Sequence, residues 1–180
     1  MNFKKIFSFL WETAKLVLIS LVIILPLRYY VVQPFFVLGA SMEPSFENGD
    51  YLIIDEISYR LNEPSRGDVV VFKYPYDTKQ YYIKRIIGLP GEIVGFKDGK
   101  IMIKNKENKD GFFLEESYLL NTKESFGGGD VTLGHNEYFV LGDNRGASSD
   151  SRRWGPLKDE FLVGKVVVRV FPFNSFNIYK

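Results

Sequence analysis

The sequence contains no cysteine and only one histidine, and these two absences remove several classes of chemistry. Without cysteine there is no disulfide, thiolate nucleophile, iron–sulfur cluster or zinc ribbon. The single histidine, His135, leaves too few ligands for a transition-metal site. We therefore expect no metal and no other cofactor. A nucleophilic mechanism would have to use serine, threonine, lysine or a carboxylate.

An excess of charge of one sign is also missing, because 23 lysines and arginines face 22 aspartates and glutamates in 180 residues. Nucleic-acid binding needs a concentrated cationic face, so nucleic acid is not an expected partner. The hydrophobic fraction of 46% excludes a disordered chain and suffices for the core of one domain, with room for an inserted subdomain. Nothing suggests an obligate partner chain, and we expect a monomer.

The longest uncharged apolar run, LVLISLVIILPL, lies near the N-terminus. It is shorter than the ~20 residues that a membrane span requires. Apolar residues extend it in both directions, however, and Lys15 and Arg28 can place their charged ends at the two interfaces. We predict a cytoplasmic N-terminus at 1–9 and a transmembrane anchor over 10–32. The alternative, a cleaved secretory signal, is disfavoured because bulky residues follow the run where cleavage needs small ones.

The distribution of positive charge predicts the orientation of this anchor. Lys4, Lys5 and Lys15 lie before or at the start of the run, whereas residues 33–59 contain no lysine or arginine. By the positive-inside rule, the N-terminus lies in the cytoplasm and residues 33–180 lie outside it. The expected localisation is a cell membrane, crossed once, with an extracytoplasmic domain beside the lipid.

The chain after the anchor has the pattern of short strands separated by turns, and no stretch keeps a period of 3.6 residues over three helical turns. The runs of strand length are DYLIIDEI, GDVVVFKY, YYIKRIIG, GEIVGF, KIMIKN, EYFVLGD and LVGKVVVRVFPF. Asp98-Gly99 predicts a two-residue hairpin. Residues 104–129 are polar and rich in glycine, which predicts a mobile insertion or a small subdomain. The predicted fold class is mainly β, with an antiparallel sheet.

Three segments could carry chemistry, and each also has an ordinary structural explanation. Ser41 lies in a Gly-Ala-Ser-Met turn, where a hydroxyl can point into a cleft, although turn serines are commonly structural. Lys84 and Arg85 must point to opposite faces of one strand, so one of them faces the interior or a cleft wall. A lysine that loses hydration can act as a general base, whereas one that snorkels stays charged. The loop 142–156 is dense in hydrogen-bonding side chains, and such loops usually organise themselves.

In combination, these segments resemble the bacterial type I signal peptidases, a membrane-anchored family of serine/lysine proteases. Four ordered motifs carry the resemblance: GASMEPSF, RGDVVVFKYP, YYIKRIIGLPGE and GDNRGASSDSRRWGP. The resemblance implies the fold of that family, with Ser41 as the nucleophile and Lys84 as the general base. It also implies that Ser148 orients the lysine amine, while Asp150 and Arg152 support the loop.

The resemblance extends to the oxyanion site and the specificity pockets. The family often has a serine two positions before the nucleophile, but here that residue is Gly39. The oxyanion would then depend on the backbone N–H groups of Ser41 and Gly39, or on a water. The pocket walls carried over by resemblance are Phe35, Val37, Met42, Phe46, Leu52, Val71, Tyr82 and Ile83. The implied function is removal of signal peptides from exported preproteins after small residues, as in Ala-x-Ala.

Two other functions remain open. One is a Ser/Lys maturation peptidase that serves a single secretion or conjugation apparatus, or a self-cleaving repressor relative, which the anchor disfavours. The other is an anchored β-domain that binds extended peptides without cutting them. A Ser/His/Asp triad would need His135, which we expect to be a solvated residue at a strand end. Loss of activity on changing Ser41 alone would separate the proteases from the binding domain.

Overall fold

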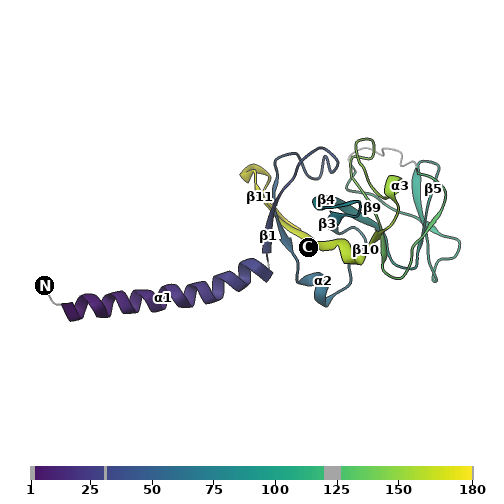
Figure 1. Cartoon of the computed structure of the whole chain (residues 1–180). Helices are drawn as coiled ribbons and strands as arrows, with labels where there is room; N and C mark the ends of the chain where they lie inside the picture. The colour runs from purple at the N-terminus through teal and green to yellow at the C-terminus, as the bar shows by residue number, and fades with distance from the viewer. Residues whose placement is uncertain (1–2, 31, 120–126, 180) are drawn as a thin grey trace.

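An N-terminal helix and a body of antiparallel strands make up the structure, a computed structural model that describes residues 3–30, 32–119 and 127–179 (Figure 1). Helix α1 (Phe3–Tyr30) projects away from the body and leads into the first strand, β1 (Val32–Phe36). In the part of the chain that could be searched, no helix is both long and apolar enough to cross a bilayer. The anchor over 10–32 therefore stays a prediction.

The larger sheet has eight strands and carries the functional residues. Its order is β1-β2-β11-β3-β4-β9-β10, with β12 beside β11. The further strands are β2 (Tyr51–Asp55), β3 (Val69–Tyr74), β4 (Asp77–Gly88), β9 (Glu137–Leu141), β10 (Leu157–Lys158), β11 (Leu162–Phe171) and β12 (Asn177–Ile178). Strand β4 pairs with β3 up to Arg85 and with β9 only from Arg85 onward. On the side away from β3, residues 77–84 consequently have no neighbouring strand in the described part of the chain.

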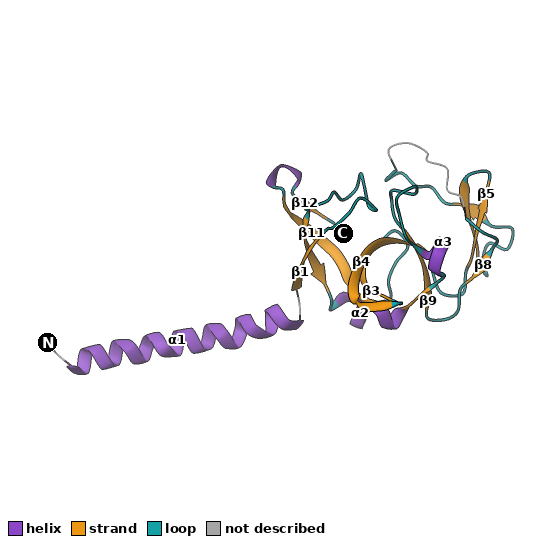
Figure 2. Cartoon of the chain, turned by 45° about the horizontal axis from the view of Figure 1, so that its top comes forward, coloured by secondary structure: helices purple, strands orange, loops and turns teal. Residues whose placement is uncertain are grey.

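The smaller sheet lies at the end of the body opposite α1 (Figure 2). Its order is β7-β6-β5-β8, and its strands are β5 (Ile93–Lys97), β6 (Lys100–Lys104), β7 (Phe112–Phe113) and β8 (Val131–Thr132). Between β5 and β6, Asp98 and Gly99 have φ values of 51° and 72°, as a two-residue hairpin turn requires, so the predicted hairpin is confirmed. Of the segment 104–129, residues 120–126 lie outside the described residues.

Short helical turns complete the fold, and three clusters of buried apolar side chains hold it together. The turns are α2 (Ser58–Leu61), α3 (Ser151–Trp154), η1 (Asp159–Phe161) and η2 (Phe173–Ser175). Strand β3 is apolar at consecutive positions because both of its faces are buried: Val69 and Val71 belong to one cluster, Val70 and Phe72 to another. The third cluster joins Ile87 of β4 to the smaller sheet. Strands β3 and β4 therefore contribute to all three clusters and form the buried centre of the β-body.

The seven predicted runs are all strands, which confirms the mainly β class. The sequence pattern does not predict β1, because Pro34 lies inside it and a proline normally argues against a strand. The structure explains this exception. Strand β1 is the outermost strand of the larger sheet, so the missing N–H of Pro34 interrupts no central ladder.

Candidate active site

Ser41 and Lys84 meet although 43 positions separate them in the sequence. Ser41 lies in the turn between β1 and β2, and Lys84 lies on β4. The amine Nζ is 2.8 Å from Ser41 Oγ and 2.7 Å from the carbonyl oxygen of Ile83. The two residues can therefore exchange a proton directly.

The environment of Lys84 favours a neutral amine. Its side chain is only 3% exposed, and among the described residues no carboxylate forms an ion pair with it. Burial lowers the pKa of Lys84 to about 8, while the charges of Asp150 and Asp143 oppose this shift. The neighbouring Arg85 is stabilised differently, because it forms a two-point ion pair with Asp143 at 2.9 and 2.6 Å. Of the two adjacent cations, the lysine is the one prepared to lose its proton.

The turn that carries Ser41 is held by the loop that follows β9. The backbone N–H of Asn144 donates to Ser41 O, and the Asn144 side-chain amide donates to Ala40 O, both at 3.0 Å. Gly142 lies so close that a Cβ there would be 2.4 Å from Ser41 O. Sequence reasoning missed Asn144, because nothing distinguishes this asparagine within a loop of many polar residues.

The backbone around the nucleophile offers one donor for an oxyanion. The N–H of Ser41 has no acceptor within the described parts of the chain. The N–H of Gly39, in contrast, donates to Asn48 Oδ1 at 2.9 Å. The geometry thus favours the Ser41 part of the predicted oxyanion site and leaves the Gly39 N–H already engaged.

The three predicted support residues lie in the loop beside the dyad. Arg152 donates from Nε and Nη2 to the two oxygens of Asp150, each at 2.8 Å. Burial acts to raise the pKa of the Asp150 carboxyl, but these bonds outweigh it and lower that pKa. Ser148 Oγ is enclosed and interacts with the Asp150 carboxyl, whose pKa it helps to lower, whereas the Lys84 amine bonds to Ser41 and Ile83 and not to Ser148.

A cleft of about 490 Å³ opens beside the dyad. Six of the eight predicted wall residues line it: Phe35, Val37, Leu52, Val71, Tyr82 and Ile83. Met42 and Phe46 do not line it; both are fully buried in the apolar cluster that also contains Leu52. The cleft also takes residues that the sequence did not single out, namely Phe36, Leu38, Gln80, Tyr81 and Ser149.

A larger groove, of about 1020 Å³, contains neither dyad residue. It is lined largely by polar side chains, and His135 is among them. This histidine is exposed, as expected from the sequence. The groove lacks the buried nucleophile and base that the smaller cleft has, so we place the chemistry in the smaller cleft.

Comparison with known proteins gives consistent matches. Residues 10–171 match the family described as signal peptidase, peptidase S26. A "Probable signal peptidase I-1" from Synechocystis is 35% identical over 172 residues, which cover 92% of this chain and 84% of that protein. A signal peptidase I from Bacillus licheniformis is 32% identical and covers 92% of this chain and 91% of its own length. Among solved structures, a signal peptidase I from Enterococcus faecalis is 33% identical, with a TM-score of 0.48 over 58% of this chain and 97% of that one.

Proposed function

The chain belongs to the signal peptidase family, peptidase S26, and we propose that Ser41 is its nucleophile and Lys84 its general base. As a member of this family it is a serine endopeptidase that removes signal peptides from preproteins, not a binding domain without activity. The observation that carries the proposal is the enclosed Lys84 amine, which lies 2.8 Å from Ser41 Oγ and has no carboxylate partner in the described part of the chain.

In the proposed reaction, the neutral Lys84 amine takes the proton of Ser41 as Oγ attacks the carbonyl carbon of the scissile peptide bond. The backbone N–H of Ser41 then donates to the oxyanion. The lysine ammonium returns a proton to the leaving amine, which departs as the new N-terminus of the mature protein. A water that Lys84 deprotonates hydrolyses the ester on Ser41, and the signal peptide leaves with a free carboxylate.

The substrate would bind as an extended strand. On the side of β4 away from β3, residues 77–84 pair with no described strand, and residues 80–84 of this stretch line the cleft. The unpaired backbone groups on that side can hydrogen-bond to a peptide backbone. Much of the cleft wall is apolar, with Phe35, Leu52 and Val71 among its residues. Such walls select by side-chain volume and disfavour charge. This supports the specificity for small residues, of the Ala-x-Ala type.

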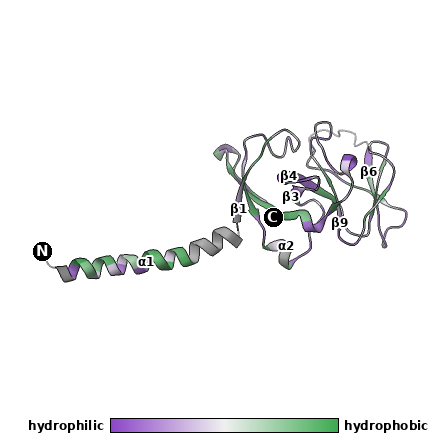
Figure 3. Ribbon diagram, in the orientation of Figure 1, coloured by the Kyte–Doolittle hydropathy of each residue, from purple (hydrophilic) through white to green (hydrophobic). Residues whose placement is uncertain are grey.

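The arrangement of apolar side chains supports a membrane anchor. Hydrophobic residues, interrupted by a few polar ones, extend along the described part of α1 (Figure 3). Those exposed include Phe7, Phe9, Leu10, Trp11, Leu16, Leu18, Ile19 and Val22. A helix that exposes apolar residues all around is stable in lipid, not in water. In this proposal α1 crosses the membrane once, with the N-terminus in the cytoplasm and the β-body outside.

The length of the connection supports the same placement. Pro34 follows the anchor and lies seven residues before Ser41. At ~3.3 Å per residue, the nucleophile stays within ~23 Å of the outer end of the anchor. The scissile bond of a preprotein lies just beyond its own apolar segment. Enzyme and substrate would thus meet at the same height above the bilayer.

The test is cleavage of a labelled preprotein with an Ala-x-Ala site by the full chain in detergent. We expect the parent to cut at that site, and Ser41→Ala and Lys84→Ala to be inactive although folded. Lys97→Ala is the matched control, because Lys97 is an exposed strand lysine of the smaller sheet, away from the dyad and from the proposed substrate edge, and it should cut like the parent. Cutting by a folded Ser41→Ala variant would reject the proposed dyad.

A further inference from the structure

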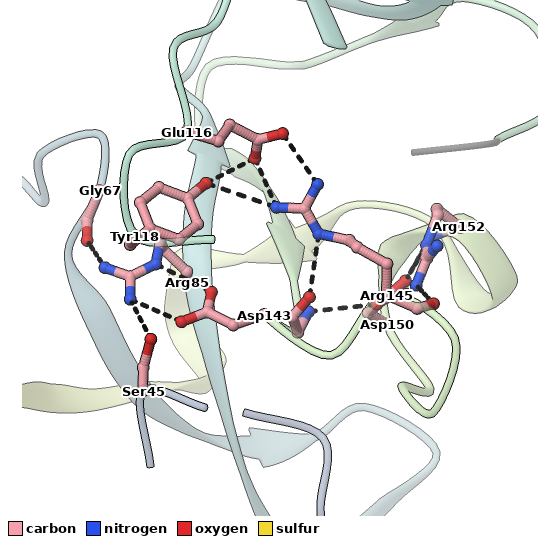
Figure 4. Close-up of polar contacts among 10 residues, drawn as sticks. Ser45, Gly67, Arg85, Glu116, Tyr118, Asp143, Arg145, Asp150 and Arg152 are labelled. Atoms are coloured by element: carbon pink, nitrogen blue, oxygen red, sulfur yellow. Dashed lines mark hydrogen bonds and ion pairs between the residues drawn. The ribbon is translucent and has the colours of Figure 1, made fainter. Parts of the chain in front are cut away.

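The segment after β7 reaches from the smaller sheet to the loop that follows β9 (Figure 4). Arg145 of that loop is 5% exposed, and its guanidinium donates to both oxygens of Glu116, at 3.0 Å from Nη1 and by a closer contact from Nη2. The hydroxyl of Tyr118 donates to Glu116 at 2.5 Å. Burial and the hydrogen bond to Glu116 raise the pKa of Tyr118, so the hydroxyl keeps its proton. We name Glu116 and Tyr118 the insertion pair.

Tyr118 also contacts the strand that carries the lysine. The Arg85 guanidinium lies over the Tyr118 ring, 4.0 Å from its centroid. Arg85 directly follows Lys84 on β4 and is fixed from other sides by Asp143 and by the carbonyl oxygen of Gly67, the latter at 2.8 Å. The ring of Tyr118 thus closes one side of the arginine next to the general base.

The loop residues that the insertion pair holds are those that hold the nucleophile. Arg145 Nε donates to Gly142 O at 3.0 Å, which closes the segment 142–145 on itself. Asn144, inside this segment, makes the two hydrogen bonds to the turn of Ser41. Glu116 is therefore connected to the nucleophile through Arg145 and the loop backbone, without touching the cleft.

The buried ion pair between Arg145 and Glu116 is suited to fixing the positions of other residues. The side chains of Arg145 and Glu116 are 2% and 13% exposed, so both charges have lost most of their hydration. A buried ion pair adds little net stability over an apolar pair, but it fixes the direction of both side chains. Direction is what a dyad needs, because an error of about 1 Å in the reacting groups can cost ~100-fold in rate.

We propose that the insertion pair positions Ser41 and Lys84 for catalysis by fixing the loop 142–145 and Arg85. Glu116 and Tyr118 are positioning residues, since neither contacts the cleft or the reacting atoms. This assigns a function in catalysis to the inserted subdomain. The inference rests on the proposed function of the dyad.

The experiment measures kcat and KM of the full chain in detergent with a substrate that carries an Ala-x-Ala site. Glu116→Gln keeps the shape of the side chain and removes its charge, and we expect kcat to fall about 10-fold while KM stays within about twofold. Tyr118→Phe keeps the ring over Arg85 and loses the two hydrogen bonds of the hydroxyl, to Glu116 and from Arg145, so kcat should fall about threefold. Glu115→Gln, the same change at an exposed neighbouring residue, is the matched control and should match the parent.

A purely structural role gives a different result. All variants are assayed at a temperature where thermal unfolding shows them to be fully folded, so a loss of stability alone leaves kcat unchanged there. Parental kcat in folded Glu116→Gln would overturn the inference, and so would a rise in KM without a change in kcat. Ser41→Ala is measured alongside. If it is inactive while Glu116→Gln is normal, only the positioning role fails; if it still cuts, the proposed function fails.

Discussion

At the scale of single residues, Lys84 shows how a position that is poor for stability can be good for chemistry. An enclosed lysine without a carboxylate partner loses hydration and gains no ion pair in return. Arg85, one residue later, has a partner in Asp143 and keeps its charge. The strand places the two cations on opposite faces, and the difference between the faces makes one a base and the other a structural residue.

The lowered pKa of Lys84 predicts the pH dependence of cleavage. Only the neutral amine can accept the Ser41 proton, and burial brings the pKa to about 8. Below that value kcat/KM should fall about tenfold per pH unit, and above it the rate should level off. The measurement is a profile of kcat/KM from pH 5 to about pH 10 with the folded full chain. A rate that does not change from pH 5 to 9 would contradict a lysine base.

At the scale of elements, strand patterns and ordered motifs predict the main strands and the two dyad residues. The wall residues and the contacts that hold the dyad depend on tertiary packing. Apolar runs of strand length identify the main strands, and the motif order places Ser41 and Lys84 in one site. Met42 and Phe46, predicted as wall residues, lie in the core beside the cleft, because they belong to a turn, where no alternation tells which side chains face the core. Asn144 and Glu116 could not be predicted, since their roles depend on contacts between distant segments.

The close approach of the loop after β9 to the nucleophile turn gives a prediction for Gly142. A Cβ at this position would lie 2.3 Å from Ser148 Oγ and 2.4 Å from the backbone oxygen of Ser41. The backbone atom cannot move without moving the nucleophile. We expect Gly142→Ala to lower kcat by about 100-fold. The measurement is steady-state cleavage by the variant, after circular dichroism has shown that it is folded.

A second glycine of the same loop provides the control. A Cβ at Gly146 would meet no atom within 4 Å, so Gly146→Ala should keep parental kcat. Equal losses in the two variants would mean that the loop tolerates no alanine, and the contact with Ser41 would not be the reason. Normal activity of Gly142→Ala would show that the turn and the loop can separate without harm to the dyad.

At the scale of the whole molecule, exposed apolar side chains are concentrated in two places, the helix α1 and one end of the β-body. Besides α1, the segment around η2 and β12 exposes Phe171, Phe173, Phe176 and Ile178, and the rim of the cleft exposes Leu38. The sequence predicts the helix from its apolar run. It does not predict this second surface, because the end of β11 and the turn η2 that follows it are left uncovered only by the fold.

The proposed anchor can be tested by placing charge in its middle. Each arginine at the centre of a spanning helix costs about 2.5–3.5 kcal/mol of insertion free energy, so Leu18→Arg with Ile19→Arg should release the chain from membranes. We expect the parent to stay in the membrane pellet after alkaline carbonate and the double variant to appear in the supernatant. Tyr76→Arg, a charge at an exposed residue of the β-body, should leave the chain in the pellet.

Activity of the released variant separates anchoring from catalysis. The dyad and its loop lie in the β-body, so the variant should cut a short soluble peptide at a rate close to that of the parent. A preprotein embedded in vesicles should be cut more slowly, because the two reactants no longer share one surface. If the double variant stays in the pellet, α1 is not the anchor. If it is released and still cuts embedded preproteins at the parental rate, the height of Ser41 above the membrane does not matter for function.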